Sequence, residues 1–461
     1  MNFWDFGTWT SIIQMGILFV AVIVGNTLRR KVPILRRTLI PTSVIAGILI
    51  LILKELGPLR NMIDNGFMEV VTYHTLGIGF IAIALKTARN KEDSKKARTD
   101  VVNTGMLTVA TYLLQGIIGL GITMGLAYTI LPGLFKASGL ILPLGFGQGP
   151  GQALNFGIIY EGLGFVGGPD FGLTVAAIGF LAACFAGVFY MNVILKKKST
   201  TIGEDIADNV DDEDEKILPT EIPLTESIDK FTMQAAIVGA AYFITFLIMQ
   251  GITYFIDMNY LGNFGINTLK PLIWGFNFLI GTLVAMLFKT IIKVSKKNNL
   301  MKRDYISNGL LNRIGGFVFD IMIVAAIAAI EIRALSSLVL PIVLMSIIGG
   351  VLTVWYVDKV CRKKFPTYWA ESSVSMFGML LGTASTGMIL LREIDPGYKT
   401  PAATNLVLQS VPAIVFGFPM LLLLGYAPLG DKQAIITFVA LIGLFIVMNL
   451  LLFRKTKAKA K

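Results

Sequence analysis

Long apolar runs alternate with short polar stretches along nearly the whole chain. A run of about 20 apolar residues is long enough to cross a bilayer as a helix. The pattern therefore predicts an all-α polytopic membrane protein. The eleven predicted spans cover residues 9–28, 39–57, 68–86, 101–131, 171–195, 232–256, 271–292, 314–333, 336–357, 401–425 and 433–453.

Two further segments are apolar but interrupted by glycine and by hydrogen-bonding side chains. They cover residues 139–161 (GLILPLGFGQGPGQALNFGIIYE) and 374–395 (VSMFGMLLGTASTGMILLREID). Irregular backbone at membrane depth is tolerated only where protein buries it or where it lines a cavity. Two interrupted segments at corresponding places in two halves point to a transporter's binding site. We expect both segments to be re-entrant and to line the substrate site.

An acidic stretch at residues 199–230 divides the chain and predicts a cytosolic linker, although a regulatory role stays open. Residues 1–198 then form a first repeat with the segment 139–161, and residues 231–425 a second repeat with the segment 374–395. Five spans in each repeat are an odd number, so the second repeat starts on the opposite side and the repeats are inverted. Residues 426–461 hold an extra C-terminal span and a basic tail.

The placement of charge orients the chain. The net charge of +11 alone is compatible with nucleic-acid binding. With the N-terminus outside, however, 34 of the 40 Lys and Arg residues fall on the inner side, as expected for a membrane protein. This places the C-terminus in the cytoplasm and the chain in the plasma (inner) membrane, with no nucleic-acid partner. The six that remain outside are Lys54, Arg60, Lys136, Lys270, Arg333 and Lys432.

Composition and motifs argue against several other functions. The single histidine and two cysteines, with no CxxC, make a transition-metal site improbable on ligand supply. The chain lacks an HExxH motif and an intramembrane nucleophile–base pair, so we expect no enzyme and no catalytic residues. It also lacks GxxxxGK[ST], which excludes primary active transport by this chain alone. A passive anion channel stays an alternative, although no ring of like charge supports it.

The interrupted segments carry the groups that an anionic substrate needs. Glycine-rich half-helices expose backbone N–H groups and direct their positive ends toward an anion. Carboxamides and hydroxyls add side-chain donors, whereas the alternative is that the glycines only permit close helix packing. The candidate substrate-binding residues are Gly147, Gln148, Gly149, Gly151, Gln152, Asn155, Gly382, Thr383, Ser385 and Thr386.

Asp320, inside the predicted span 314–333, is the sharpest candidate for binding a coupling ion. A carboxylate within the membrane costs roughly 2.5–3.5 kcal/mol on insertion scales and marks a functional site by default. The alternative is that Asp320 lies nearer the cytosolic interface and pairs with Arg313. Thr75 and Asn405 are weaker candidates for the same role. The residues leave open whether the ion is sodium or a proton.

At this point the chain resembles the bacterial sodium:glutamate symporters, as a divergent member. Departures from that family's pattern are Gln148 for a histidine, Pro150 for a small hydroxyl residue and Asp320 for a serine. The resemblance is carried by Thr75–Ile78 (TLGI), by Gln115 with Gly119 and Gly121, by Glu331–Pro341 (EIRALSSLVLP), by Gly145–Ala153 (GFGQGPGQA) and by Met376–Gly387 (MFGMLLGTASTG).

The resemblance implies a secondary active symporter that couples inward sodium movement to uptake of glutamate by alternating access. It further implies a homodimer with a fixed scaffold and a mobile transport domain (an elevator), and no cofactor besides the coupling ion Na⁺. A proton- or sodium-coupled carrier of another small carboxylate stays an alternative, because the departures lie in the binding segment itself.

Overall fold

A computed structural model describes residues 3–86, 95–195, 229–258, 262, 265–298, 305–396 and 399–454, and these are almost entirely helical. The predicted linker 199–230 lies outside the described residues except for its last two positions. The longest helices are α1 (Phe6–Lys31), α4 (Asn65–Leu85), α5 (Lys95–Thr129), α8 (Gly168–Phe189), α9 (Lys230–Asp257), α12 (Asn277–Lys297), α13 (Asn308–Ala329), α14 (Val339–Lys364), α18 (Ser410–Tyr426) and α19 (Asp431–Phe453).

Within the described residues, ten helices are long and apolar enough to cross a membrane, not the eleven expected. The predicted span 39–57 was wrong in this respect. It contains α3 (Thr42–Glu55), whose 14 residues extend only about 21 Å at 1.5 Å per residue. Apolar composition alone did not show that Pro41 and Gly57 would bound this helix so tightly.

Helix starts follow familiar capping chemistry. The carboxylate of Asp64 accepts a hydrogen bond from the N–H of Gly66 at the start of α4, and Asp229 does the same for Thr232 in α9. The hydroxyl of Ser307 caps α13. Each side chain satisfies an N–H group that the first helical turn leaves without a backbone partner.

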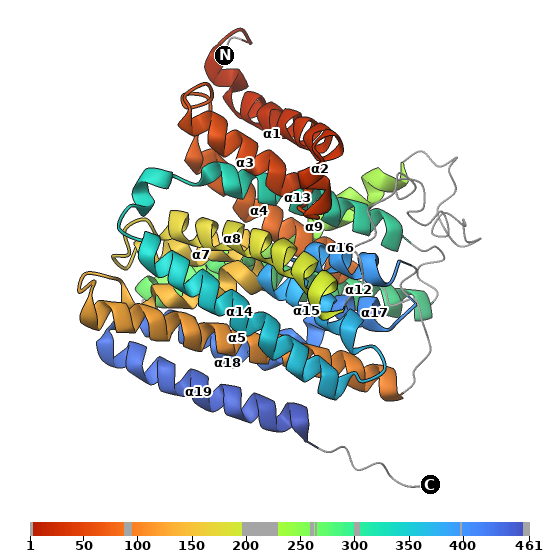
Figure 1. Cartoon of the computed structure of the whole chain (residues 1–461). Coiled ribbons are helices and arrows are strands. Elements are labelled where there is room, and N and C mark those ends of the chain that lie inside the picture. The colour runs from red at the N-terminus through yellow and green to blue at the C-terminus, as the bar shows by residue number, and fades with distance from the viewer. Residues whose placement is uncertain are drawn as a thin grey trace.

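The helices pack into two bundles, which meet along α4, α7, α8 and α13. We call α1, α3, α4, α9, α12 and α13 the first bundle. The second bundle contains α5, the segment 136–161, α8, α14 and α15 (Trp369–Leu381), together with α16 (Ala384–Ile394), α17 (Ala402–Leu408), α18 and α19. In Figure 1, α1 and α3 lie at the top, whereas α5, α18 and α19 lie toward the bottom. Each bundle therefore takes helices from both halves of the chain.

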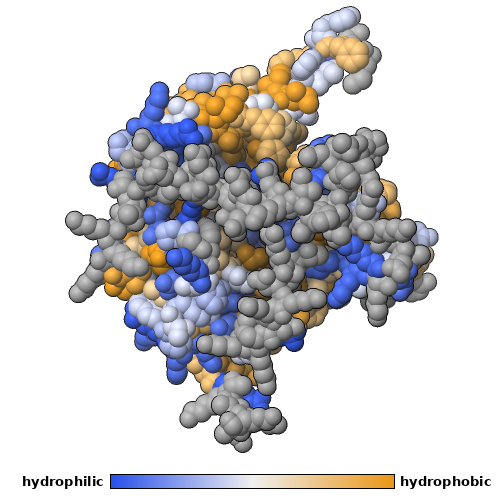
Figure 2. Space-filling model, turned by 90° about the vertical axis from the view of Figure 1, so that its right-hand side faces the viewer, coloured by the Kyte–Doolittle hydropathy of each residue, from blue (hydrophilic) through white to orange (hydrophobic). Residues whose placement is uncertain are grey.

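The sides and one end of the molecule differ in polarity. Many large apolar side chains on α1, α9 and α19 are exposed, such as Ile23, Phe243 and Val439. Figure 2 looks at the end of the molecule that is on the right in Figure 1, and it shows hydrophilic side chains at that end. Apolar sides with a polar end are what a bilayer-spanning helix bundle requires.

Candidate functional site

The first interrupted segment folds back on itself as a helical hairpin. One arm consists of η1 (Lys136–Leu140), α6 (Ile141–Pro143) and η2 (Leu144–Gln148), and the other is α7 (Pro150–Glu161). The two ends lie side by side, because the ring of Phe135 is 5.5 Å from that of Tyr160 and 5.2 Å from that of Phe165. The turn is at Gly149, whose φ of +90° is a conformation that L side chains rarely adopt.

The second interrupted segment is a hairpin of two helices, α15 and α16, and it begins at Trp369 rather than at the predicted residue 374. The arms pack tightly: a Cβ on Gly387 would lie 2.4 Å from the carbonyl oxygen of Ser375. Thr383 forms the turn, and its hydroxyl accepts a hydrogen bond from the N–H of Thr386 at 3.4 Å. This bond caps α16 at its first turn.

The tips of the two hairpins meet. A Cβ placed on Gly149 would lie 3.5 Å from Cγ2 of Thr383, which is ordinary van der Waals contact. On the neighbouring helix α8, Gly179 packs against both Phe146 of the first hairpin and the carbonyl of Leu381 of the second. Helices α7 and α16 both begin at this junction, so the partial positive charges of two helix N-termini lie at one place.

Two carboxamides close to the junction have unused hydrogen-bonding groups. Gln152, in the first turn of α7, is 0% exposed, and neither its Oε1 nor its Nε2 has a partner among the described residues. Gln115 of α5 donates from Nε2 to the carbonyl of Leu380 at 2.9 Å and to Thr353, while its Oε1 has no partner there. A buried polar group without a partner costs about 1–3 kcal/mol, so such groups mark a place that a ligand can satisfy.

The structure gathers only some of the predicted substrate residues at the tips. Gly149, Gln152, Thr383 and the buried Thr386 lie there, with Gly382 at the end of α15. Gln148, the last residue before the turn, is half-buried. The side chain of Ser385 lies outside the described part of the structure.

The other predicted substrate residues have packing or bonding roles beside the tips. The carbonyl of Gly147 accepts a hydrogen bond from the hydroxyl of Tyr112, and Gly151 permits contact with Leu76. Asn155 points to α11 (Lys270–Gly275), where its Nδ2 donates to the carbonyl of Gly275 at 2.9 Å.

The predicted coupling-ion residues are not gathered at one place. Asp320 is exposed on α13, whereas Gly149, Gln152 and Thr386 at the tips are buried, and it forms no ion pair with Arg313 within the described residues. The hydroxyl of Thr75 donates to the carbonyls of Val71 and Thr72 on its own helix. Asn405 donates a hydrogen bond to the hydroxyl of Tyr368. Tyr368 directly precedes α15, so this bond lies at the end of α15 that is far from the hairpin tip.

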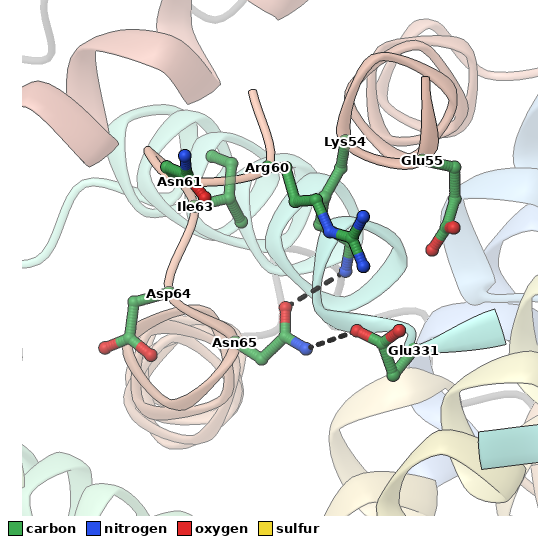
Figure 3. Close-up of a pocket in the computed structure, with 8 residues that line it drawn as sticks. All are labelled: Lys54, Glu55, Arg60, Asn61, Ile63, Asp64, Asn65 and Glu331. Carbon is green, nitrogen blue, oxygen red and sulfur yellow. Dashed lines mark hydrogen bonds between the residues drawn. The ribbon is translucent and has the colours of Figure 1, made fainter. Parts of the chain in front are cut away.

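A cavity of about 380 Å³ lies where α3 and α13 end and α4 begins, and Figure 3 shows the residues that line it. Lys54 is 4% exposed, and its ammonium donates to the carbonyls of Ala328 and Ile330 and to Asn65 at 2.7–3.0 Å. These bonds satisfy carbonyls at the end of α13. The cavity is lined by Lys54, Glu55, Arg60, Asn61, Ile63, Asp64, Asn65 and Glu331.

Sequence reasoning gave no site role to Lys54, Asp170 or Glu331. Glu331 donates its backbone N–H to the carboxylate of Asp170 at 2.6 Å, which joins α8 of the second bundle to the end of α13 in the first. The sequence feature that could have indicated these three residues is the presence of charged side chains at the ends of otherwise apolar runs. Among the described residues, no group of three or more His, Cys, Asp or Glu side chains is arranged to hold a metal ion.

Comparison with known proteins identifies the family. The family model described as sodium/glutamate symporter matches residues 6–395, a region that includes both hairpins. A search of curated proteins and a search of solved structures found no match. The expected family and the expectation that the chain is not an enzyme are thereby confirmed, since this is a family of transporters. The chain belongs to the sodium/glutamate symporter family.

Proposed function

We propose that this chain imports glutamate, or a closely related amino-dicarboxylate, by symport with sodium. The observation that carries this proposal is the meeting of the two hairpin tips at Gly149 and Thr383. Two helix N-termini at one buried place favour a carboxylate ligand. The family supplies sodium and glutamate as the expected pair.

The tips offer a partner for each end of an amino acid. In our proposal, N–H groups in the first turns of α7 and α16 donate to the substrate's carboxylates. The two groups of Gln152 serve opposite charges, since Nε2 donates to a carboxylate and Oε1 accepts from the substrate ammonium. The hydroxyl of Thr383, and behind it that of Thr386, completes the set. Gln152 has both groups unpartnered among the described residues, as this role requires.

In our proposal, alternating access depends on the fact that each bundle contains helices from both halves of the chain. We propose two inverted repeats, in which α3, although short, still carries the chain from one face to the other as the second crossing of the first repeat, and whose hairpins are re-entrant and enter from opposite faces. In support, α7 lies toward the left of Figure 1, and α16 and α17 lie toward the right. The second bundle, which holds both tips, would move as an elevator against a fixed first bundle, and the first bundle would form the homodimer.

The orientation proposed is that of the charge distribution. The Lys54 cavity would face outward, and the polar end of Figure 2 would face the cytoplasm. The N-terminus would then be outside and the C-terminus inside, in the plasma membrane.

Uptake of radiolabelled glutamate into proteoliposomes tests the function, with sodium and proton gradients imposed separately. We expect accumulation above equilibrium only with an inward sodium gradient. Competition by unlabelled aspartate, glutamine and glutarate then separates the need for a second carboxylate from the need for an ammonium. Absence of glutamate uptake under both gradients would overturn the proposal, and proton-driven uptake would overturn its sodium coupling.

A further inference from the structure

Two buried carboxamides with unpartnered oxygens lie in the region where the first hairpin contacts α4 and the start of α12. Asn155 of α7 is 3% exposed and Asn277, at the start of α12, is 0% exposed. Neither Oδ1 has a partner among the described residues. Asn277 is two residues from Gly275, whose carbonyl binds Asn155, so both side chains belong to one locality.

The orientation of both amides is fixed by their nitrogen atoms. Nδ2 of Asn155 donates to the carbonyl of Gly275 at 2.9 Å, and Nδ2 of Asn277 donates to the carbonyl of Tyr73 at 3.3 Å. Reversing either amide would set an oxygen against an oxygen. The two Oδ1 atoms are therefore acceptors, and each needs a donor or a cation.

The backbone near Asn155 and Asn277 supplies a further oxygen atom. The helix is interrupted at Phe276, between α11 and α12, with φ −97° and ψ 25°. The carbonyl of Gly275, the last residue of α11, accepts one amide hydrogen bond and keeps a second lone pair, whereas the carbonyl of Tyr73 inside α4 also accepts a helical N–H group. Carboxamide and carbonyl oxygens are ligands that hard cations take in proteins.

We propose that Asn155 and Asn277 hold a monovalent cation between the two bundles, with Na⁺ as the ion. The oxygen atoms that this region offers are all uncharged, which suits a single positive charge better than a divalent one. This inference rests on the proposed sodium coupling and gives it a location. It also moves the ion away from Asp320, Thr75 and Asn405.

The position of Asn155 connects the ion to the substrate. Asn155 and Gln152 are three residues apart on α7 and therefore lie on one face of that helix. Asn155 is five residues past the start of α7, or about 7.5 Å along the helix axis. An ion at Asn155 would fix the hairpin arm that presents Gln152, so binding of the ion and of the substrate would favour each other.

Thermal unfolding of the purified full-length protein in detergent tests the site without any transported substrate. NaCl is titrated against choline chloride at constant ionic strength, because a ligand that binds only the folded state raises the unfolding midpoint. The variants are Asn155→Leu and Asn277→Leu. Asn449→Leu, on the distant helix α19, is the matched control, since the Oδ1 of Asn449 accepts a hydrogen bond from the hydroxyl of Tyr356 on α14.

We expect the half-saturating Na⁺ concentration to rise at least about tenfold in both leucine variants, as loss of a ligand to a charged group implies. Asn449→Leu should leave it unchanged. No Na⁺ effect on the natural protein, or equal half-saturation in natural and leucine variants, would overturn the site. If glutamate uptake fails while these shifts occur, only the transport proposal falls.

Discussion

At the scale of single residues, Gln152 combines complete burial with two unused polar groups. Its neighbours at the tips are mainly glycines and threonines, which contribute backbone N–H groups or hydroxyls, and the carboxamide of Gln148 just before the turn is only half-buried. Gln152 is therefore the side chain on which recognition of the substrate depends most.

Replacing Gln152 by leucine should raise the half-saturating glutamate concentration at least tenfold, since hydrogen bonds to charged groups are worth about 1.5–3 kcal/mol. The measurement is initial uptake into proteoliposomes at saturating sodium. Gln250→Leu is the matched control, because Gln250 is exposed on α9. Equal half-saturation in the two variants would remove Gln152 from the substrate site.

Asp395 ends the second hairpin and carries a turn. Burial would raise the pKa of its carboxyl. The carboxylate, however, accepts hydrogen bonds from the N–H and hydroxyl of Thr400 and from the N–H of Lys399. These bonds and the charge of Lys399 lower the pKa below its usual value. Because the folded-state pKa is the lower one, the stabilisation is present above the unfolded value of about 3.9 and is lost as the pH falls below it.

At pH 7, Asp395→Asn should therefore lower the free energy of unfolding by about 1 kcal/mol. The variant should unfold at a lower temperature than the natural protein. The difference should shrink as the pH is lowered below about 4. Unfolding midpoints in detergent across this range provide the measurement. A difference that is constant with pH would show that the charge of Asp395 does not stabilise the turn.

Lys54 carries the hydrogen bonds at the end of α13, so its loss leaves buried carbonyls without a donor. Lys54→Met keeps the length of the side chain and should destabilise the protein by about 1–3 kcal/mol. Lys432→Met is the control, because Lys432 is exposed. Thermal unfolding of both variants in the same detergent measures the effect, and equal midpoints would contradict it.

At the scale of elements, the first hairpin depends on close contact between backbones. Gly119 of α5 and Gly139 of η1 face each other, and a Cβ on either would lie 2.0–2.1 Å from the other's backbone. Backbone atoms cannot move aside as a flexible side chain can. The glycines thus set how closely the hairpin lies against α5.

Gly139→Ala should lower stability by at least about 1–3 kcal/mol, the usual range for overpacking, and should reduce uptake. Gly443→Ala on α19 is the matched control, since a Cβ there meets nothing within 4 Å. That variant should be neutral or slightly stabilised. Fluorescence-detected size exclusion after heating compares the two, and similar losses would refute the packing argument.

The sequence predicted the elements better than their contacts. The apolar runs predicted the ten long helices, and the interrupted segments marked where the two hairpins lie. Both patterns arise because the bilayer requires apolar spans with their backbone hydrogen bonds satisfied. The length of α3 was missed, since its flanking residues are apolar too. Asp320 and Asn405 were singled out by their polarity alone, and polarity does not tell which residue a side chain meets in space.

At the scale of the whole molecule, the contact of Asp170 with Glu331 is a polar contact that joins the two bundles. An elevator motion would separate these residues. Contacts inside a bundle, such as Gln234 with Ser307, would be kept.

A disulfide between cysteines at positions 170 and 331, in a background where Cys184 and Cys361 are replaced by serine, should stop uptake. A reductant should restore it. Because both native cysteines are buried, the background should be checked for uptake first. The control pair replaces Gln234 and Ser307 within the first bundle and should leave transport unchanged. Full uptake by the oxidised 170–331 pair would exclude sliding between the bundles.

The meeting of the two tips also has a consequence for synthesis of the protein. Gly149 emerges from the ribosome more than two hundred residues before Thr383, so the first hairpin enters the membrane without the second. Until then Gln152 lies in an unfinished membrane protein, where polar groups without partners are unfavourable. The first half is therefore a natural target for membrane chaperones and proteases, and co-expressed halves should protect each other from degradation.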